Sequence, residues 1–312
     1  MIPTPEPPSL SSEDDKASHG GRAVSQSRAG RFFAEFGHAA IFGGLSFVLW
    51  WLFAWAIQEQ PWVENALTWT IFSLLPAVVV TTLLLLRIRG RPIAAIGLAF
   101  NSGALRQTCA GAGIGAGMAV LITGVQYGAG WVEVEPATEQ LRNTLGDFIW
   151  TPPFWSGLAI LIVGSAGEEL LFRGYGLQQL IRATNPWVAI LGTSAVFGVM
   201  HGDNPDASLV GIVNTGLFGA LFGFALVRQR SLWLPFGMHC GWNCLLATIG
   251  ASVSGLKIRL AGVALVPRGP VLWSGGDYGP EASLLATVAV VAAGFVIWKM
   301  PVEDRNPPRL WD

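Results

Sequence analysis

The sequence predicts an all-α membrane protein, a polytopic bundle of about eight transmembrane helices with a polar cavity inside its core helices. Hydrophobic residues make up 52% of the 312 residues and charged residues only 12%, which is about half the charged share of a soluble domain. Apolar stretches of about 20 residues, the length that spans the hydrocarbon as a helix, recur along the chain. The 14 tryptophans are also typical of membrane interfaces.

Eight apolar stretches are expected to form the spans, although the fifth is short and leaves a count of seven or eight. They are about His38–Ile57, Leu67–Leu86, Arg106–Tyr127, Phe154–Leu180, Trp187–His201, Leu209–Val227, Leu232–Ala251 and Ala282–Met300. The third contains Gly111, Gly113, Gly115 and Gly117, and no strand precedes them. We therefore expect small residues that let helices approach closely, rather than a nucleotide-binding loop.

The chain is expected to divide into six segments. These are a disordered cytoplasmic tail (1–35), the first transmembrane helices (36–149), the helices that carry the buried polar residues (150–251), an ordered outer loop (252–281), the last span (282–300) and a second disordered cytoplasmic tail (301–312). The first tail is rich in proline, serine and mixed charge and has no apolar core. This composition indicates disorder and excludes a signal peptide there.

The distribution of basic residues predicts the orientation in the membrane. Only four of the 19 basic residues, Arg142, Lys257, Arg259 and Arg268, fall in the segments expected outside, which leaves 15 for the inside. Basic residues favour the cytoplasmic side, so both ends are predicted to be cytoplasmic. The net charge of −1 argues against nucleic acid as a partner, because phosphate binding needs a basic surface.

An acidic pair in the fourth span predicts a functional site, because ionisable residues within a membrane span are costly. Adjacent residues of a helix point about 100° apart, so Glu168 and Glu169 are expected to have different partners. Arg173 lies at the ion-pair spacing from Glu169, which leaves Glu168 to face a cavity as a general base. The alternative is a buried Glu–Arg network that only holds helices together.

Two histidines and an asparagine complete the candidate site. His201 ends the fifth span, a place where a lone histidine is more often structural. His239 and Asn243 share one face of the seventh span, because they are four residues apart. Both can donate hydrogen bonds to a developing oxyanion, although hydrogen bonds between helices are the alternative use.

The three cysteines, Cys109, Cys240 and Cys244, show no disulfide framework and are expected to be packing residues. A zinc site built from His239, Cys240 and Cys244 is disfavoured, because Cys240 points away from the other two and no fourth ligand is evident nearby.

Three motifs in order resemble the CPBP intramembrane endopeptidases, also called the ABI or CAAX-protease family. They are Glu-Glu-x-x-x-Arg at 168–173, Phe-x-x-x-His at 197–201 and His-x-x-x-Asn at 239–243. The resemblance covers about Trp150–Ala251, and no motif position departs from the pattern. The flanking stretches Ser231–Pro235 and Gly275–Glu281 resemble bacterial members.

The resemblance implies a peptidase that cleaves a membrane-associated protein or peptide within a cell membrane. It implies that Glu168 activates water with His201 as its partner, that His239 and Asn243 stabilise the oxyanion, and that Glu169 and Arg173 support them. It favours a site without metal or other cofactor, with zinc as the alternative. A non-catalytic scaffold that regulates a partner is the second hypothesis, and a small proton-coupled transporter is the third.

Overall fold

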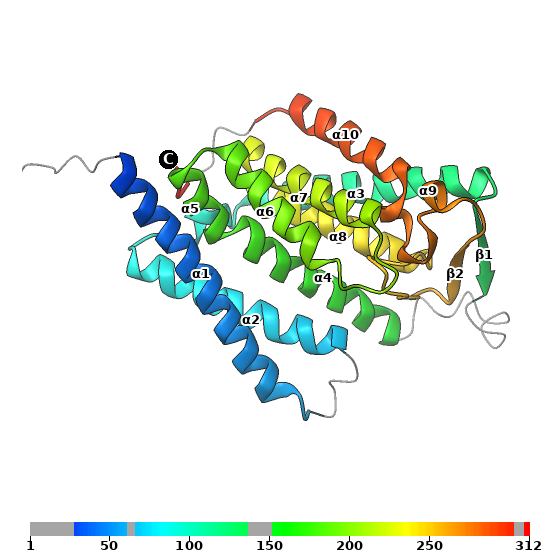
Figure 1. The fold of residues 1–312 in the computed structure, drawn as a ribbon, viewed down its shortest axis with the longest axis horizontal. Helices are drawn as coiled ribbons and strands as arrows, with labels where there is room; N and C mark the ends of the chain where they lie inside the picture. The colour runs from blue at the N-terminus through cyan, green and yellow to red at the C-terminus, as the bar shows by residue number, and fades with distance from the viewer. Residues whose placement is uncertain (1–27, 61–65, 137–151, 303–308) are drawn as a thin grey trace, which may run out of the picture.

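The computed structural model describes residues 28–60, 66–136, 152–302 and 309–312, and these residues form a helical bundle (Figure 1). Its long helices are α1 (Arg28–Ile57), α2 (Ala66–Ile88), α3 (Ser102–Gly128), α4 (Pro152–Arg173), α6 (Pro186–Met200), α7 (Leu209–Gln229), α8 (Trp233–Thr248) and α10 (Leu284–Lys299). The short elements are η1 (Ile93–Ile96), α5 (Tyr175–Ala183), α9 (Val271–Ser274), η4 (Gly276–Tyr278) and η5 (Pro280–Ala282). In Figure 1, α1 and α2 lean against one side of the bundle and α10 crosses the opposite side.

The chain is a polytopic helical membrane protein. Among the described residues, five segments are long and apolar enough to cross a bilayer: α1, most of α2 (Trp69–Ile88), α3, the α4–α5 segment (Phe154–Ala183) and α7. The helices α6 and α10 are apolar but have only 15 and 16 residues, and α8 has 16. At about 1.5 Å per residue these three fall short of a hydrocarbon core of about 30 Å. The predicted count of eight is therefore loose.

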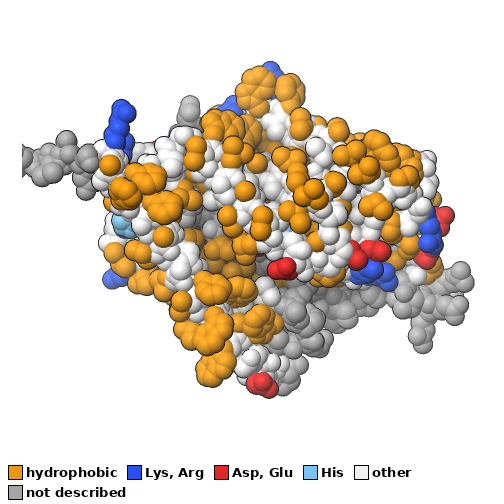
Figure 2. Space-filling view, viewed as in Figure 1, with side chains coloured by type: hydrophobic (Ala, Val, Ile, Leu, Met, Phe, Trp, Pro, Cys, Tyr) orange, Lys and Arg blue, Asp and Glu red, His pale blue; other side chains and the backbone are white. Residues whose placement is uncertain are grey.

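Apolar side chains cover the face shown in Figure 2, with few charged ones among them. A soluble protein of this size would not leave so many large apolar side chains exposed. The exposed set includes Trp51 and Trp55 on α1, Leu191 on α6 and Val291 on α10. These helices therefore present apolar surface to lipid.

The closest helix packing joins α3 to α8, and glycines on both helices make it possible. A Cβ atom at Gly111 would come within 2.2 Å of the Leu234 carbonyl oxygen, and one at Gly115 within 2.0 Å of the Met238 oxygen. On α8, a Cβ atom added at Gly237 or Gly241 would likewise lie 2.2 Å from a backbone oxygen of α3. This confirms the prediction of close helix approach for Gly111 and Gly115.

The other two glycines of this run do not contribute to the contact. A Cβ atom at Gly113 or Gly117 would meet nothing within 4 Å. They lie two residues from the contact positions, which places them on other faces of the helix.

The fourth expected span is not one continuous helix. It breaks at Gly174, where α4 ends and α5 begins. A Cβ atom at Gly174 would lie 2.2 Å from the Leu170 carbonyl oxygen, so a side chain there would clash with the preceding turn. The break follows Arg173 directly and separates the acidic α4 from the buried α5.

The two tails were expected to be disordered, but residues 28–35 and 309–312, which the structure describes, are ordered. Helix α1 begins at Arg28, within the segment expected to be disordered, and residues 1–27 lie outside the described part. The reason is Glu35, which is buried and ion-paired with Arg89 at 3.2 Å and Arg182 at 3.1 Å. These contacts tie the first turns of α1 to the end of α2 and to α5.

The described end of the chain is also packed rather than free. Arg309 and Leu310 are buried, and Leu310 joins a small apolar cluster with Ile96 and Tyr175. The Arg309 guanidinium donates to the Ala94 oxygen at 2.6 Å, and the Leu310 amide donates to the Ala95 oxygen at 3.1 Å. Residues 303–308 lie outside the described part.

The predicted orientation requires the N-terminal helix start, the α2–α3 and α7–α8 connections and the chain end to lie on one side of the membrane. The contacts of Glu35 and Arg309 place them together. That this side is cytoplasmic stays a prediction.

At the opposite end lies a two-stranded sheet that the sequence did not predict. Strand β1 (Val132–Pro136) pairs antiparallel with β2 (Val263–Pro267), and Val134 lies opposite Leu265. The segment 252–281, expected as an ordered loop, contains β2, α9, η4 and the start of η5. Asn214 of α7 holds the end of this segment, because its side-chain amide donates to the backbone carbonyl oxygens of Glu281 and Ser283 at 2.7 and 2.8 Å.

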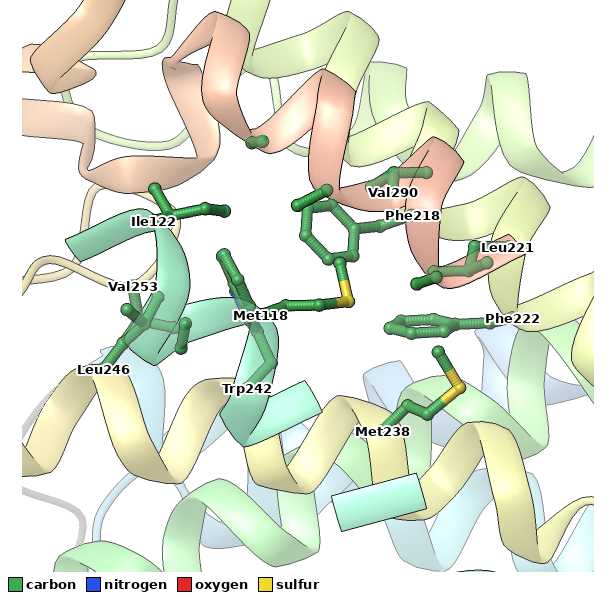
Figure 3. Close-up of a cluster of buried hydrophobic side chains, with 14 of the residues drawn as sticks. Met118, Ile122, Phe218, Leu221, Phe222, Met238, Trp242, Leu246, Val253 and Val290 are labelled. Atoms are coloured by element: carbon green, nitrogen blue, oxygen red, sulfur yellow. The ribbon is translucent and has the colours of Figure 1, made fainter. Parts of the chain in front are cut away.

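The main core lies where α3, α7, α8 and α10 meet (Figure 3). Trp242 and Met238 of α8 point towards Phe218 and Phe222 of α7 in this view, and the Phe218 and Trp242 rings lie 4.8 Å apart. This packing fixes the rotation of α8 and therefore the direction in which its polar face points.

Candidate active site

The two adjacent glutamates of α4 have different surroundings, as the sequence predicts. Glu169 is 1% exposed, and its Oε1 accepts hydrogen bonds from Arg173 Nη1 at 3.0 Å and from His239 Nδ1 at 2.9 Å. Arg173 lies one turn further along α4, and His239 comes from α8. Glu169 therefore joins the two helices through one carboxylate oxygen.

Arg173 is held in place by aromatic rings. Its guanidinium lies 4.6 Å from the centre of the Phe197 ring, 5.3 Å from Phe222 and 5.7 Å from Phe172. It also donates to the Gly219 carbonyl oxygen at 3.0 Å. A cation over aromatic faces is stabilised in a site without water. Arg173 therefore supports Glu169 rather than facing the cavity.

Glu168 faces a cavity of about 610 Å³. Its side chain is 31% exposed, and in the part of the chain that the structure describes its Oε2 has no hydrogen-bond partner. His239 Nε2 lies 3.8 Å from Oε2. A partly exposed carboxylate that lines a cavity can accept a proton from a molecule bound there.

His201 lines the same cavity and ends α6 as its C-terminal cap. Its Nδ1 lies 2.7 Å from the Phe197 carbonyl oxygen. Because a carbonyl oxygen only accepts, Nδ1 must carry the proton, and Nε2 of the neutral ring is then an acceptor. His201 and Glu168 share the cavity, but no hydrogen bond joins them among the described residues.

His239 and Asn243 lie one turn apart on α8, and both line the cavity. The His239 ring stacks on Phe222 at 5.2 Å, and its Nδ1–H faces the Glu169 carboxylate. Its Nε2 is left on the side of Glu168. The Asn243 amide donates to Ser165 Oγ at 3.3 Å, a long hydrogen bond.

The rest of the cavity wall is mostly apolar and comes from distant parts of the chain. Helices α1 and α2 contribute a wall with three aromatic residues, Phe47, Trp50 and Trp69. The turn after α8 contributes Val253, Leu256 and Ile258. Apolar walls with a few convergent polar groups are typical of sites that bind a substrate.

The zinc alternative needs at least three ligands close together. Among the described residues, no three His, Cys, Asp or Glu side chains lie close enough to share a metal ion. All three cysteines are free thiols. Whether catalysis proceeds without a metal stays a prediction.

All six residues of the predicted site are brought together, four at the cavity and two behind it. The sequence analysis missed Ser165 and Asn204, which line the cavity, and Glu281, which lies behind its wall. Ser165 carried a signal, because it precedes Glu169 by four residues in an apolar helix and therefore lies on the same face. Asn204 lies in a turn and Glu281 in the three-residue η5, which are too short for residue spacing to define a face.

Comparison with known proteins agrees with this geometry. A protein-family model described as type II CAAX prenyl endopeptidase Rce1-like matches residues 150–245. The uncharacterized protein YyaK of Bacillus subtilis is 30% identical over 156 residues, which cover 48% of this chain and 49% of YyaK. The putative membrane peptidase YdiL of the same organism is 32% identical over 82 residues, 26% of this chain and 32% of YdiL.

The chain thus spans about half the length of YyaK and about a third of YdiL. No solved structure gives a significant match. The matched region begins with α4 and ends within α8, so it contains all three motifs and every predicted site residue. The resemblance stated from the motifs is confirmed over residues 150–245, where this chain is similar to the Rce1-like type II CAAX prenyl endopeptidases.

Proposed function

We propose that this protein is an intramembrane endopeptidase that hydrolyses a peptide bond of a membrane-associated protein or peptide. The observation that carries the proposal is that the partly exposed Glu168 carboxylate lines a cavity that also holds His201, His239 and Asn243. A carboxylate that only held helices together would be buried between them, as Glu169 is.

In the proposed reaction, Glu168 takes a proton from a water molecule in the cavity while the water oxygen bonds to the scissile carbonyl carbon. Nε2 of His201 accepts the second hydrogen of that water in a hydrogen bond and so orients it. The carbonyl oxygen gains the negative charge of the tetrahedral intermediate. When the carbon–nitrogen bond breaks, the protonated Glu168 returns its proton to the leaving amine.

The Asn243 amide is the proposed neutral donor to the oxyanion, and it would exchange its long bond to Ser165 for one to the substrate oxygen. His239 can donate from Nε2 only when both ring nitrogens carry protons, because Nδ1–H is already used by Glu169. Glu169 and Glu168 lie on either side of the ring.

The substrate is proposed to lie in or on the bilayer. The cavity wall formed by Phe47, Trp50 and Trp69 belongs to helices α1 and α2, which also present apolar surface to lipid. A water-soluble peptide would gain little from such a wall, whereas an apolar segment would bury its surface there.

The proposal is tested by comparing membrane proteomes of cells that carry the native protein with those that carry Glu168→Gln at equal abundance. We expect at least one membrane peptide whose new end appears only with the native protein. Identical peptide ends in both cells would instead support the non-catalytic scaffold.

We also propose that both ends of the chain are cytoplasmic, on the basis of the 15 to four division of basic residues. Reporter fusions after Asp312 and within 252–281 test this. The two reporters should give opposite results, with the reporter after Asp312 in the cytoplasm. A reporter after Asp312 that is found outside contradicts the orientation.

A further inference from the structure

Glu281 is a second carboxylate near the candidate site, and it comes from a different part of the chain. It is 5% exposed and lies in η5, just before α10. Trp242 Nε1 donates to its Oε1 at 2.8 Å, and the Ser254 backbone amide donates to its Oε2 at 2.5 Å. Unlike Glu168, both oxygens of Glu281 have a donor.

The first of these donors belongs to the helix that carries the proposed oxyanion residues. Trp242 directly precedes Asn243, and its ring is packed in the core beside Met118 (Figure 3). The bond to Glu281 fixes the indole from its polar edge while Phe218 fixes it from the side. The rotation of α8 at Asn243 therefore depends on both contacts.

The second donor belongs to the turn that lines the cavity after α8. Ser254 has φ +47°, a backbone conformation that is uncommon for residues other than glycine and needs support from its surroundings. The Ser254 carbonyl oxygen accepts a hydrogen bond from the Asn204 side chain at 2.9 Å. Asn204 follows His201 by three residues, and both line the cavity.

Glu281 thus connects two walls of the cavity through one side chain. Oε1 binds Trp242 of α8, the helix that carries Asn243. Oε2 binds the turn at Ser254, which Asn204 joins to the loop after His201. A buried carboxylate is costly unless its oxygens are hydrogen-bonded. Here the two donors, an indole side chain and a backbone amide, come from separate segments of the chain.

We propose that Glu281 is a positioning residue of the candidate peptidase site, which holds Asn243 and the His201 loop at the separation that the reaction needs. This inference rests on the proposed function for its catalytic part. Its structural part, the hold on residues 252–256, is measured independently of activity.

The test uses the full chain in nanodiscs and compares the native protein with Glu281→Gln. Glutamine has the same shape, but its amide nitrogen would face one of the two N–H donors and lose that bond. The control is Thr287→Val, which removes a hydroxyl that donates to Asn214 Oδ1 at 2.7 Å. Thr287 belongs to the same buried network but touches neither the Glu281 carboxylate nor the cavity.

The first measurement is amide hydrogen exchange. In Glu281→Gln, residues 252–256 should exchange faster while α7 and α10 keep their protection, and Thr287→Val should not accelerate exchange at 252–256.

The second measurement is cleavage of the peptide found with the native protein. We expect kcat to fall by about 10²-fold, the cost of a misplacement of about 1 Å, with KM little changed. A Trp242→Phe variant removes the indole donor and should also lower kcat. In the double variant, kcat should fall by a smaller factor than the product of the two single-variant factors, because both changes break the same contact.

Unchanged exchange at 252–256 would overturn the hold on the turn. Faster exchange with native kcat per folded molecule would overturn the link to catalysis. If the native protein and Glu168→Gln cleave equally, the proposed function fails, whereas the exchange measurement still decides whether Glu281 holds the turn.

Discussion

Two regions of the bundle contain acidic residues close to cations or histidines, but the pairing differs. At the end that holds the chain terminus, Glu35 pairs one oxygen with Arg89 and the other with Arg182. At the cavity, Glu168 has an oxygen without a hydrogen bond, and the ring nitrogen facing it is 3.8 Å away. A buried, fully paired carboxylate stabilises a fold, whereas a partly exposed carboxylate at a cavity can take part in proton transfer.

Glu169 shows that this difference is not a matter of distance along the chain. It is the neighbour of Glu168 on α4, yet it is buried and bound by Arg173 and His239 through Oε1, and its Oε2 has no partner among the described residues. Adjacent positions on one helix can therefore differ, one bound between helices and the other facing a cavity. Substitutions in the two regions are the direct way to test the comparison.

The largest expected effect belongs to Glu168→Gln. Turnover should fall by about 10²–10⁴-fold, the usual cost of losing a general base, while thermal stability changes little because Glu168 Oε2 has no hydrogen bond to lose. Both quantities are measured on the same purified sample, with the peptide found in the proteome comparison. Near-native turnover would remove Glu168 from the mechanism.

Asn243→Ala is expected to have the second largest effect. Loss of one oxyanion donor costs about 10²–10³-fold in turnover, and KM should change little because the contact strengthens only in the transition state. If Asn243 only joins helices through Ser165, its loss costs about 0.6–2 kcal/mol of stability. Reduced stability with native turnover per folded molecule would therefore refute the oxyanion role.

Glu35→Gln should have the opposite pattern. It breaks two ion pairs whose arginines are partly exposed, so the loss of stability should lie at about 1–3 kcal/mol, between the values for exposed and buried pairs. Turnover per folded molecule should remain native, because Glu35 does not line the cavity. Thermal unfolding and turnover measured together decide this, and a large loss of turnover at unchanged stability would end the comparison.

The smallest effect is expected from a strong chelator. The proposed mechanism uses Glu168 and water, so activity of the purified protein should survive chelation, and metal analysis should find no stoichiometric zinc. Activity that is lost on chelation and restored by zinc would reverse this expectation. His201 and His239 would then become candidate metal ligands, because Nε2 of each ring is available.

The sequence by itself determined the membrane class, the approximate helices and the members of the site. Apolar length and low charge are properties of local sequence, and the i, i+4 spacing fixes which residues share a helix face. Three features follow from helix geometry: the different directions of Glu168 and Glu169, the pairing of Glu169 with Arg173, and the shared face of His239 and Asn243.

Only the tertiary structure decided how the separate helices and loops meet. No local pattern shows that Glu35 would order the start of α1 through Arg182, or that the residues from Arg309 onward would dock on the loop after α2. Likewise, His239 meets Glu169 because glycines let α8 approach α3 and the core fixes its rotation. Glu281 reaches the site from 39 residues beyond Trp242, and contacts of that range depend on the packing of the whole chain rather than on the period of any one element.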